Sequence, residues 1–171
     1  MLLDTVVGEQ DTVVVERGYG VPVHPDDRAG FSERYIRSKL EGKGWEVWRG
    51  GFLHANRKRE VYPNVERRYA MAERLLDDRI SALQYIGVVH HGMPDLLCYK
   101  FGRFKFVECK LGYEAIRDNQ VETISLLQGL GFDVEVHRVV EHATQRRQTR
   151  YDVASGDRLV LDEQSCLSSY A

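Results

Sequence analysis

Two apolar-rich stretches, residues 93–100 and 104–110, stand out in the hydrophobic pattern of the chain. Both have the length and composition of β-strands, and Gly102-Arg103 between them is a suitable turn. The pattern therefore predicts a β-hairpin. A four-residue loop centred on the same point would pair the two strands in the same way.

Side chains alternate between the two faces of a strand, so the second stretch places four residues on one face: Phe104, Phe106, Glu108 and Lys110. With the predicted turn, Phe101 pairs with Phe104. Counting outwards, Asp95 lies opposite Lys110. Asp95 and Glu108 are then diagonal neighbours on one face, with Cβ atoms roughly 7 Å apart. From there both carboxylates can converge on one ion.

A helix is predicted over residues 31–40, with Ser32 as its N-cap. Glu33, Ile36 and Leu40 recur at helical spacing, so Glu33 lies on the apolar face and looks towards the sheet. The alternative for Glu33 is an ordinary first-turn glutamate favoured by the helix dipole.

A second helix is predicted over residues 114–128, and one of its faces carries Ile116, Gln120, Ile124 and Leu127. A glutamine on this apolar stripe can point back at the two carboxylates. The alternative for Gln120 is a partly buried amide that caps a loop.

The longest amphipathic pattern covers residues 64–86, where apolar residues recur every three or four positions. It predicts one helix, roughly 33 Å long at 1.5 Å per residue, with Asn64 as its N-cap and Gly87 at its end. Its apolar stripe packs either on the protein's own core or against a second copy of the chain in a homodimer.

Strands at residues 45–49 and 133–140 complete the order α-β-β-β-α-β, which predicts an α/β (α+β) fold with a central mixed sheet between helices. The length fits one domain. We expect the following organisation: a single domain over 1–171, a core over 31–140, a helical insertion over 57–87, and peripheral hairpins over 12–24 (joined around Gly18) and 151–162.

Charge is unevenly distributed, although the net charge is only -2. Residues 28–110 carry seventeen bases and ten acids, whereas both flanking parts are acidic. Clustered charge creates the field that attracts phosphates. The dense run Arg57-Lys58-Arg59 is either a clamp on a nucleic-acid backbone or a solvated surface.

Other classes of protein fit poorly. No apolar run is long enough to span a bilayer, and the first residues do not resemble a secretion signal, so we expect an intracellular protein, cytoplasmic or nucleoid-associated, without a membrane partner. The three cysteines form no CxxC pair. We expect Cys98 and Cys109 to be buried free thiols on the hairpin face opposite the acids.

The predicted hairpin contains a candidate metal site, because the carboxylates of Asp95 and Glu108, together with Lys110, can hold a hard divalent cation beside a phosphate. A solvated polar edge is the simpler explanation. However, Glu108 lies in an apolar strand, where charged residues rarely occur without a partner.

Four segments together resemble the PD-(D/E)XK nuclease superfamily, and within it the VRR-NUC (virus-type replication-repair nuclease) branch and its Holliday-junction-resolvase relatives. The segments are residues 92–97, 106–110, 117–120 and 131–136. The resemblance is dense over residues 92–140, weaker over 31–52, and absent from residues 56–87 and the termini.

This resemblance implies a metal-dependent DNA endonuclease acting on branched, flap or junction DNA in replication, repair or recombination. Asp95, Glu108 and the backbone carbonyl of Cys109 would bind Mg²⁺, for which Mn²⁺ would substitute, and no small-molecule cofactor is expected. Lys110 would polarise water or stabilise the developing charge, and it would not be the nucleophile. By resemblance, Glu33 completes the metal site or positions water, and Gln120 lies beside the lysine.

Two alternatives stay open from the sequence. The chain could be a nucleic-acid-binding module that keeps the fold without catalysis, although the presence of Asp95, Glu108 and Lys110 together argues against this. It could also be a restriction-type or RNA-directed nuclease on the same core.

Overall fold

The computed structural model describes residues 12–21, 29–54, 63–140 and 144–166. Its elements, in chain order, are β1 (Thr12–Gly20), α1 (Phe31–Gly42), β2 (Glu46–Arg49), the 3₁₀ helix η2 (Gly50–His54), α2 (Pro63–Leu76), α3 (Arg79–Val89), β3 (Leu96–Lys100), β4 (Arg103–Leu111), α4 (Asp118–Gly129), β5 (Asp133–Val140), β6 (Thr144–Tyr151) and β7 (Arg158–Cys166).

The strands form one seven-stranded sheet in the order β2-β3-β4-β5-β1-β6-β7. The three central strands, β4, β5 and β1, run parallel to one another, and the other pairs are antiparallel. The predicted order α-β-β-β-α-β is confirmed in α1, β2, β3, β4, α4 and β5. Helices α2 and α3 are inserted between β2 and β3.

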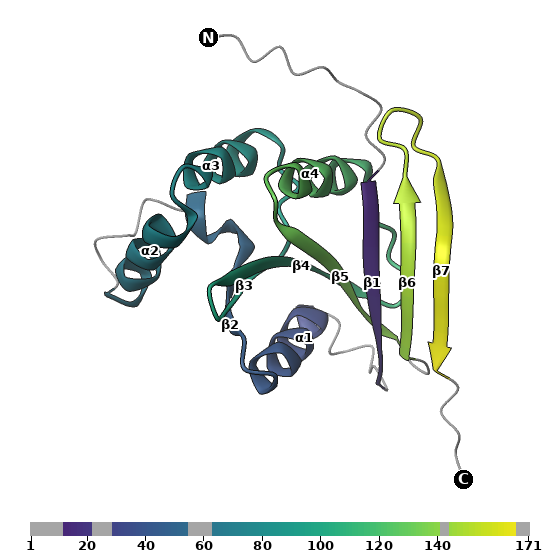
Figure 1. The fold of residues 1–171 in the computed structure, drawn as a ribbon. Helices are drawn as coiled ribbons and strands as arrows, with labels where there is room; N and C mark the ends of the chain where they lie inside the picture. Colours follow the sequence, from purple (N-terminus) through teal and green to yellow (C-terminus); the bar gives the residue numbers. More distant parts are fainter. Residues whose placement is uncertain (1–11, 22–28, 55–62, 141–143, 167–171) are drawn as a thin grey trace.

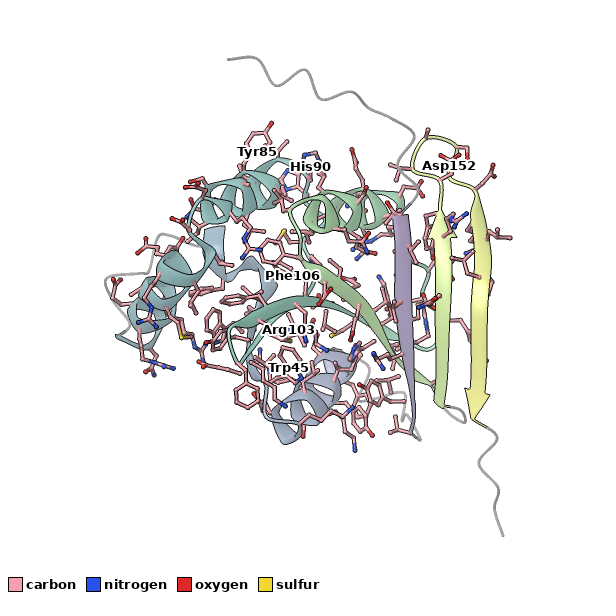
Figure 2. The ribbon with its side chains drawn as sticks, viewed as in Figure 1. Trp45, Tyr85, His90, Arg103, Phe106 and Asp152 are labelled. Carbon is pink, nitrogen blue, oxygen red and sulfur yellow. The ribbon has the colours of Figure 1, made fainter. Side chains whose placement is uncertain are left out.

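Helices cover both faces of the sheet, as predicted (Figure 1). On one face, α2, α3 and α4 bury a cluster that includes Trp48, Leu83 and Phe106. On the other face, α1 packs Ile36 and Leu40 against a second cluster. Phe106 lies in the interior, whereas Tyr85 projects outward from α3 (Figure 2).

The β3–β4 hairpin is confirmed, but its predicted register is wrong by two residues. Lys100 pairs with Arg103 and Leu97 pairs with Phe106. The turn is therefore Phe101-Gly102, whose φ angles of 49° and 76° suit the two-residue turn that matches strand twist. A shift of two residues leaves every side chain on its predicted face.

The predicted single helix over residues 64–86 is wrong, because the chain breaks at Asp77 into α2 and α3. Asp77 has φ of 49°, a left-handed conformation that ends a helix and that aspartate tolerates better than most residues. Asn64 lies inside α2, which starts at Pro63, and α3 continues past Gly87 to Val89. The stripe packs on the protein's own core through Ala72, Leu76, Leu83 and Ile86.

The predicted N-terminal hairpin is also wrong where it is described. Thr12–Gly20 is one uninterrupted strand that joins the middle of the sheet, pairing with β5 on one side and β6 on the other. Residues 22–24 of that prediction lie outside the described residues. At the C-terminal end, the hairpin predicted over residues 151–162 is confirmed, but its two strands extend further in both directions than predicted.

Helix ends differ in smaller ways. Gly30, in a left-handed conformation, occupies the N-cap of α1, so Ser32 is a buried residue inside the helix and the predicted Ser32 cap is wrong. Helix α4 starts at Asp118, four residues after the predicted start. In the described parts of the chain, no helix is both long and apolar enough to cross a lipid bilayer.

Candidate active site

Asp95 lies just before β3, at the mouth of the hairpin. One of its carboxylate oxygens, Oδ2, accepts a hydrogen bond of 2.8 Å from the backbone N–H of Cys109 on β4. Extending the observed register by one pair places Asp95 opposite Glu108. The observed register therefore favours two acids that face each other, and not the diagonal pair that the sequence predicted.

Glu108, Lys110 and Gln120 form a buried polar cluster between the sheet and α4. Their exposed fractions are 3%, 5% and 4%. The Lys110 ammonium Nζ lies 3.1 Å from Glu108 Oε1 and donates to Gln120 Oε1 at 2.8 Å. Gln120 Nε2 donates to Glu108 Oε1 at 2.5 Å. One amide thus bridges a carboxylate and an ammonium.

The first turn of α4 determines where Gln120 points. Gln120 is the third helical residue, and its Oε1 also accepts from the backbone N–H of Arg117, 3.0 Å away. This bond satisfies a donor that the helix start leaves free. The Gln120 side chain is therefore held by three partners, and the sequence-based placement of Gln120 beside the lysine agrees with this geometry.

Burial and neighbouring negative charges disfavour the ionised form of both carboxyl groups. Burial, with the nearby Asp95 charge, raises the pKa of Glu108 to about 7, although Lys110 and Gln120 favour the ionised form. Burial also raises the pKa of Asp95, against the opposing effect of the Cys109 N–H bond. Such raised values are common at functional sites, and a bound cation would relieve them.

Two further glutamates lie within electrostatic range of Asp95. Glu33, on the first turn of α1, is exposed at the edge of the stripe that buries Ser32, Ile36 and Leu40, and it raises the pKa of Asp95. Glu114 raises it as well.

Sequence reasoning missed Glu114 by placing it inside a helix. It lies in the loop between β4 and α4, where its Oε2 accepts from the backbone N–H of Leu111 at 3.3 Å. The signal that could have shown this was Gly112, directly after the Glu-Cys-Lys run, where φ is 59°. A glycine in that conformation ends the strand and starts a turn.

Close backbone contacts position Asp95. The Gly50 N–H donates to the Asp95 carbonyl at 2.8 Å, and a Cβ atom on Gly50 would lie 1.7 Å from the carbonyl oxygen of Pro94. Similarly, a Cβ on Gly92 would lie 2.4 Å from the carbonyl oxygen of Asn119 on α4. Only glycine fits at either position, so the Pro-Asp segment is held between η2 and α4.

The two thiols of the hairpin lie on the other face, as predicted. Cys98 and Cys109 are free and buried in the cluster beneath α1. Burial raises the pKa of Cys98 to about 12 and that of Cys109 further still. Neither side chain is suited to act as a nucleophile or metal ligand. The predicted DNA-binding run Arg57-Lys58-Arg59 lies outside the described residues.

The donor set fits a small hard cation. Across the described residues, no group of three or more histidine, cysteine or carboxylate side chains is close enough to hold a metal. Two carboxylates are nevertheless sufficient for Mg²⁺, which keeps several waters and also accepts backbone and phosphate oxygens. Burial and the neighbouring negative charges, which together raise the pKa of Glu108 and of Asp95, are the structural features that favour a cation here.

The mixed sheet, with Pro-Asp and Glu-x-Lys on neighbouring strands beneath a glutamine-bearing helix, defines a restriction-endonuclease-like core of the PD-(D/E)XK class. The VRR-NUC domain model matches residues 48–141, more than half of the chain, and the protein therefore belongs to the VRR-NUC domain family, a family of nucleases. Comparison with curated proteins and with solved structures gives no match.

Proposed function

We propose that this nuclease is a Mg²⁺-dependent endonuclease that hydrolyses phosphodiester bonds of branched, flap or junction DNA in replication, repair or recombination. The observation that carries the proposal is the buried Glu108 carboxylate, bonded to Lys110 and Gln120 and placed beside Asp95. Two carboxylates beside a single lysine at this depth leave a negative charge that a further cation would neutralise. The excess of bases over acids in residues 28–110 supports a polyanionic substrate.

Asp95, Glu108 and the backbone carbonyl of Cys109 are the groups that would hold the metal. Because the N–H of Cys109 already faces Asp95, and both polar groups of a strand residue point to the same edge, its carbonyl is directed to that edge as well. When bound, Mg²⁺ supplies a water of lowered pKa and neutralises charge on the phosphate.

The protein groups then have separate roles. The Lys110 ammonium stabilises negative charge that develops on the phosphoryl oxygens, and Gln120 keeps that ammonium in place. The Cys109 N–H fixes the orientation of Asp95. Glu33, exposed but near Asp95, orients a water at the rim of the site.

Cleavage of a labelled DNA panel tests the proposal. The panel contains a duplex, a single strand, a flap, a splayed arm and a four-way junction, each with Mg²⁺, Mn²⁺ or EDTA. Asp95→Asn and Lys110→Ala remove the proposed groups. Asp133→Asn and Lys100→Ala are matched controls. Lys100 lies at the end of β3 and Asp133 at the start of β5, the two strands that flank β4, and both residues lie outside the site.

The proposal predicts metal-dependent cutting that both site variants lose and both controls keep, with branched substrates preferred. Binding without cutting under every metal would favour a non-catalytic module instead. Cutting of RNA alone would replace DNA with RNA as the substrate.

A further inference from the structure

A second hollow lies on the same face of the sheet as the candidate active site. It encloses about 530 Å³ where the loop after β4 meets β1, β6 and β7. Its wall is formed by Tyr113–Ile116, and its floor includes Gly18, Thr149 and Val160. In Figure 1, β6 and β7 lie beyond the helices that pack on the rest of the sheet. No role proposed above uses this hollow.

The strand pairing places the hollow near the active site. Lys110 pairs with Arg138 across β4 and β5, and Arg138 pairs with Gly18 across β5 and β1. Adjacent strands lie about 4.8 Å apart, so the hollow begins one strand away from the catalytic lysine. A group bound there would be a close neighbour of the phosphate bound at Lys110.

The wall of the hollow is held in place by Arg138. Its Nη1 donates to the carbonyl of Gly112 at 2.9 Å and to the carbonyl of Glu114 at 2.6 Å. A second contact, 3.4 Å from Nη2 to Glu16 Oε1, anchors the arginine to β1. The shape of the hollow therefore depends on bonds between three elements and is a built feature of the fold.

The lining combines charged groups of both signs, including Glu16 and Glu114, with aromatic and apolar surface. Arg138 has an acidic partner in Glu16, at 3.4 Å, whereas the Arg17 side chain pairs with Glu135 on the opposite face of the sheet. Arg158 is exposed and forms no ion pair with any residue that the structure describes. Tyr113, at the rim, is 100% exposed.

An exposed aromatic ring can stack on a base, and an arginine that has no ion-pair partner among the described residues can contact a phosphate. The volume is in the range of small-ligand sites. A Watson–Crick pair keeps both bases inside the duplex stack, so a base can reach this hollow only if it is unpaired.

We infer that the hollow binds an unpaired nucleotide of the substrate beside the scissile phosphate, with Tyr113 stacking on its base and Arg158 contacting a phosphate oxygen. This inference rests on the proposed function and narrows it. The preferred substrates carry at least one unpaired nucleotide at the point of cleavage, and the loop after β4 recognises it.

Binding measured in EDTA tests the inference apart from cleavage. Fluorescence anisotropy at fixed salt compares three DNAs: a duplex with a short unpaired arm, the same DNA with abasic sites at the branch, and a fully paired duplex. The variant is Tyr113→Ala with Arg158→Ala. The matched control is Phe101→Ala with Arg103→Ala, which removes another exposed aromatic and another exposed arginine at the far end of β4.

We expect the wild type to prefer the intact arm over the abasic arm. The Tyr113/Arg158 variant should lose that preference, with affinity for the intact arm falling about five- to a hundred-fold, while the control retains it. 2-Aminopurine at the branch should be quenched on binding the wild type and Tyr113→Phe, but not Tyr113→Ala.

The inference would be overturned if the Tyr113/Arg158 variant lost affinity equally for all three DNAs, or lost no affinity for any of them. If the wild type cuts the panel but shows no preference for the intact arm, the nucleotide-binding role of the hollow is rejected and the nuclease proposal stands. If the preference depends on Tyr113 but no metal supports cutting, the proposed function fails and the hollow stands.

Discussion

At the scale of single residues, Gln120 is the side chain that links the carboxylate and the ammonium of the candidate site. Gln120→Ala leaves both the Glu108 carboxylate and the Lys110 ammonium without their shared partner. Loss of a partner that orients functional groups typically costs 10- to 100-fold, so we expect the cleavage rate to fall by about that factor. Single-turnover kinetics at saturating metal would measure it.

Gln128→Ala is the matched control for Gln120. It lies on the same helix, and its Nε2 donates to the carbonyl of Val13 at 2.7 Å, far from the site. We expect this variant to lose about 1 kcal/mol of stability but little activity. Equal cleavage rates for the two variants would show that Gln120 has no role in catalysis.

The raised pKa of Glu108 has a consequence for stability. Because burial and Asp95 raise this pKa to about 7 in the folded protein, the folded state holds the proton more tightly than the unfolded chain does. The contribution of Glu108 to stability is therefore fully present below its unfolded pKa of about 4.5 and is lost as pH rises through 7.

The measurement is the difference in unfolding free energy between the wild type and Glu108→Gln, in EDTA, from pH 5 to 8. We expect the wild type to lose roughly 2 to 3 kcal/mol relative to the variant over that interval. The comparison cancels any constant effect of the substitution on Lys110. At pH 8, Mg²⁺ should restore stability to the wild type and not to the variant, since a cation bound only by the folded state stabilises it. A difference that does not change with pH would contradict this.

At the scale of elements, the contact between η2 and the start of β3 should control the position of Asp95. In Gly50→Ala, the new Cβ would overlap the Pro94 carbonyl, and the Gly50–Asp95 backbone bond would have to shift. We expect a loss of more than about 2 kcal/mol of stability and a large loss of cleavage, even though Gly50 carries no functional group.

Gly42→Ala is the control for Gly50. It lies at the end of α1 with no other atom within 4 Å of the added Cβ and without a left-handed backbone. We expect it to be neutral or to stabilise the protein by up to about 1 kcal/mol. Urea unfolding of both variants, together with cleavage assays, would measure the contrast. Full activity in Gly50→Ala would show that the segment before β3 tolerates displacement.

Comparison of elements shows which of them could be predicted. The strand over residues 133–140 and the faces of β4 follow from local alternation, which survives an error of two residues in the hairpin register. The break at Asp77 could not be predicted, because the apolar stripe continues through it and only the backbone conformation changes. The residues of β1 were predicted to form a hairpin. Their pairing with β5 and β6 joins residues over a hundred positions apart, and a local pattern cannot show such pairing.

In the site as well, the features that depend on local sequence patterns could be predicted, and those that depend on loop conformation could not. Asp95, Glu108 and Lys110 are close in sequence, and one hairpin brings them together. Gln120 reaches Glu108 and Lys110 from the first turn of α4. The apolar stripe of the predicted helix was sufficient to place Gln120 on the face that points to them. Glu114 and the packing of Gly50 on Pro94 depend on loop conformation, which no periodic pattern encodes.

At the scale of the whole molecule, a partly buried ionic network joins the three parallel strands at the centre of the sheet. On the face covered by α1, Glu135 of β5 accepts from His137 at 2.7 Å and Lys105 of β4 at 3.0 Å, and it pairs with Arg17 of β1 at 3.3 Å. The other ring nitrogen of His137 lies 3.0 Å from the Tyr19 hydroxyl. These contacts connect β4, β5 and β1 independently of the hydrophobic core.

The pKa values in this network predict how the fold responds to acid. Burial alone would raise the pKa of Glu135, but the His137 bond and the Lys105 ammonium outweigh it and hold the pKa well below its usual range. Burial lowers the pKa of His137, so its ring stays neutral, donates from Nε2 to Glu135 and accepts from Tyr19. Both groups stabilise the fold above their unfolded pKa values and lose that contribution as pH falls.

Glu135→Gln tests this prediction at the centre of the sheet. At pH 7 the variant should lose about 3 kcal/mol, because it leaves Lys105 and His137 buried without their anion. The gap should narrow as pH falls below about 4.5, where the unfolded chain takes up the proton that the native carboxylate resists. Asp133→Asn, on the same strand but in an exposed pair with Arg103, should cost under 1 kcal/mol. Denaturant unfolding of the three proteins from pH 3 to 7 would decide it: a gap that widens in acid would show that the native Glu135 is not held ionised by its neighbours.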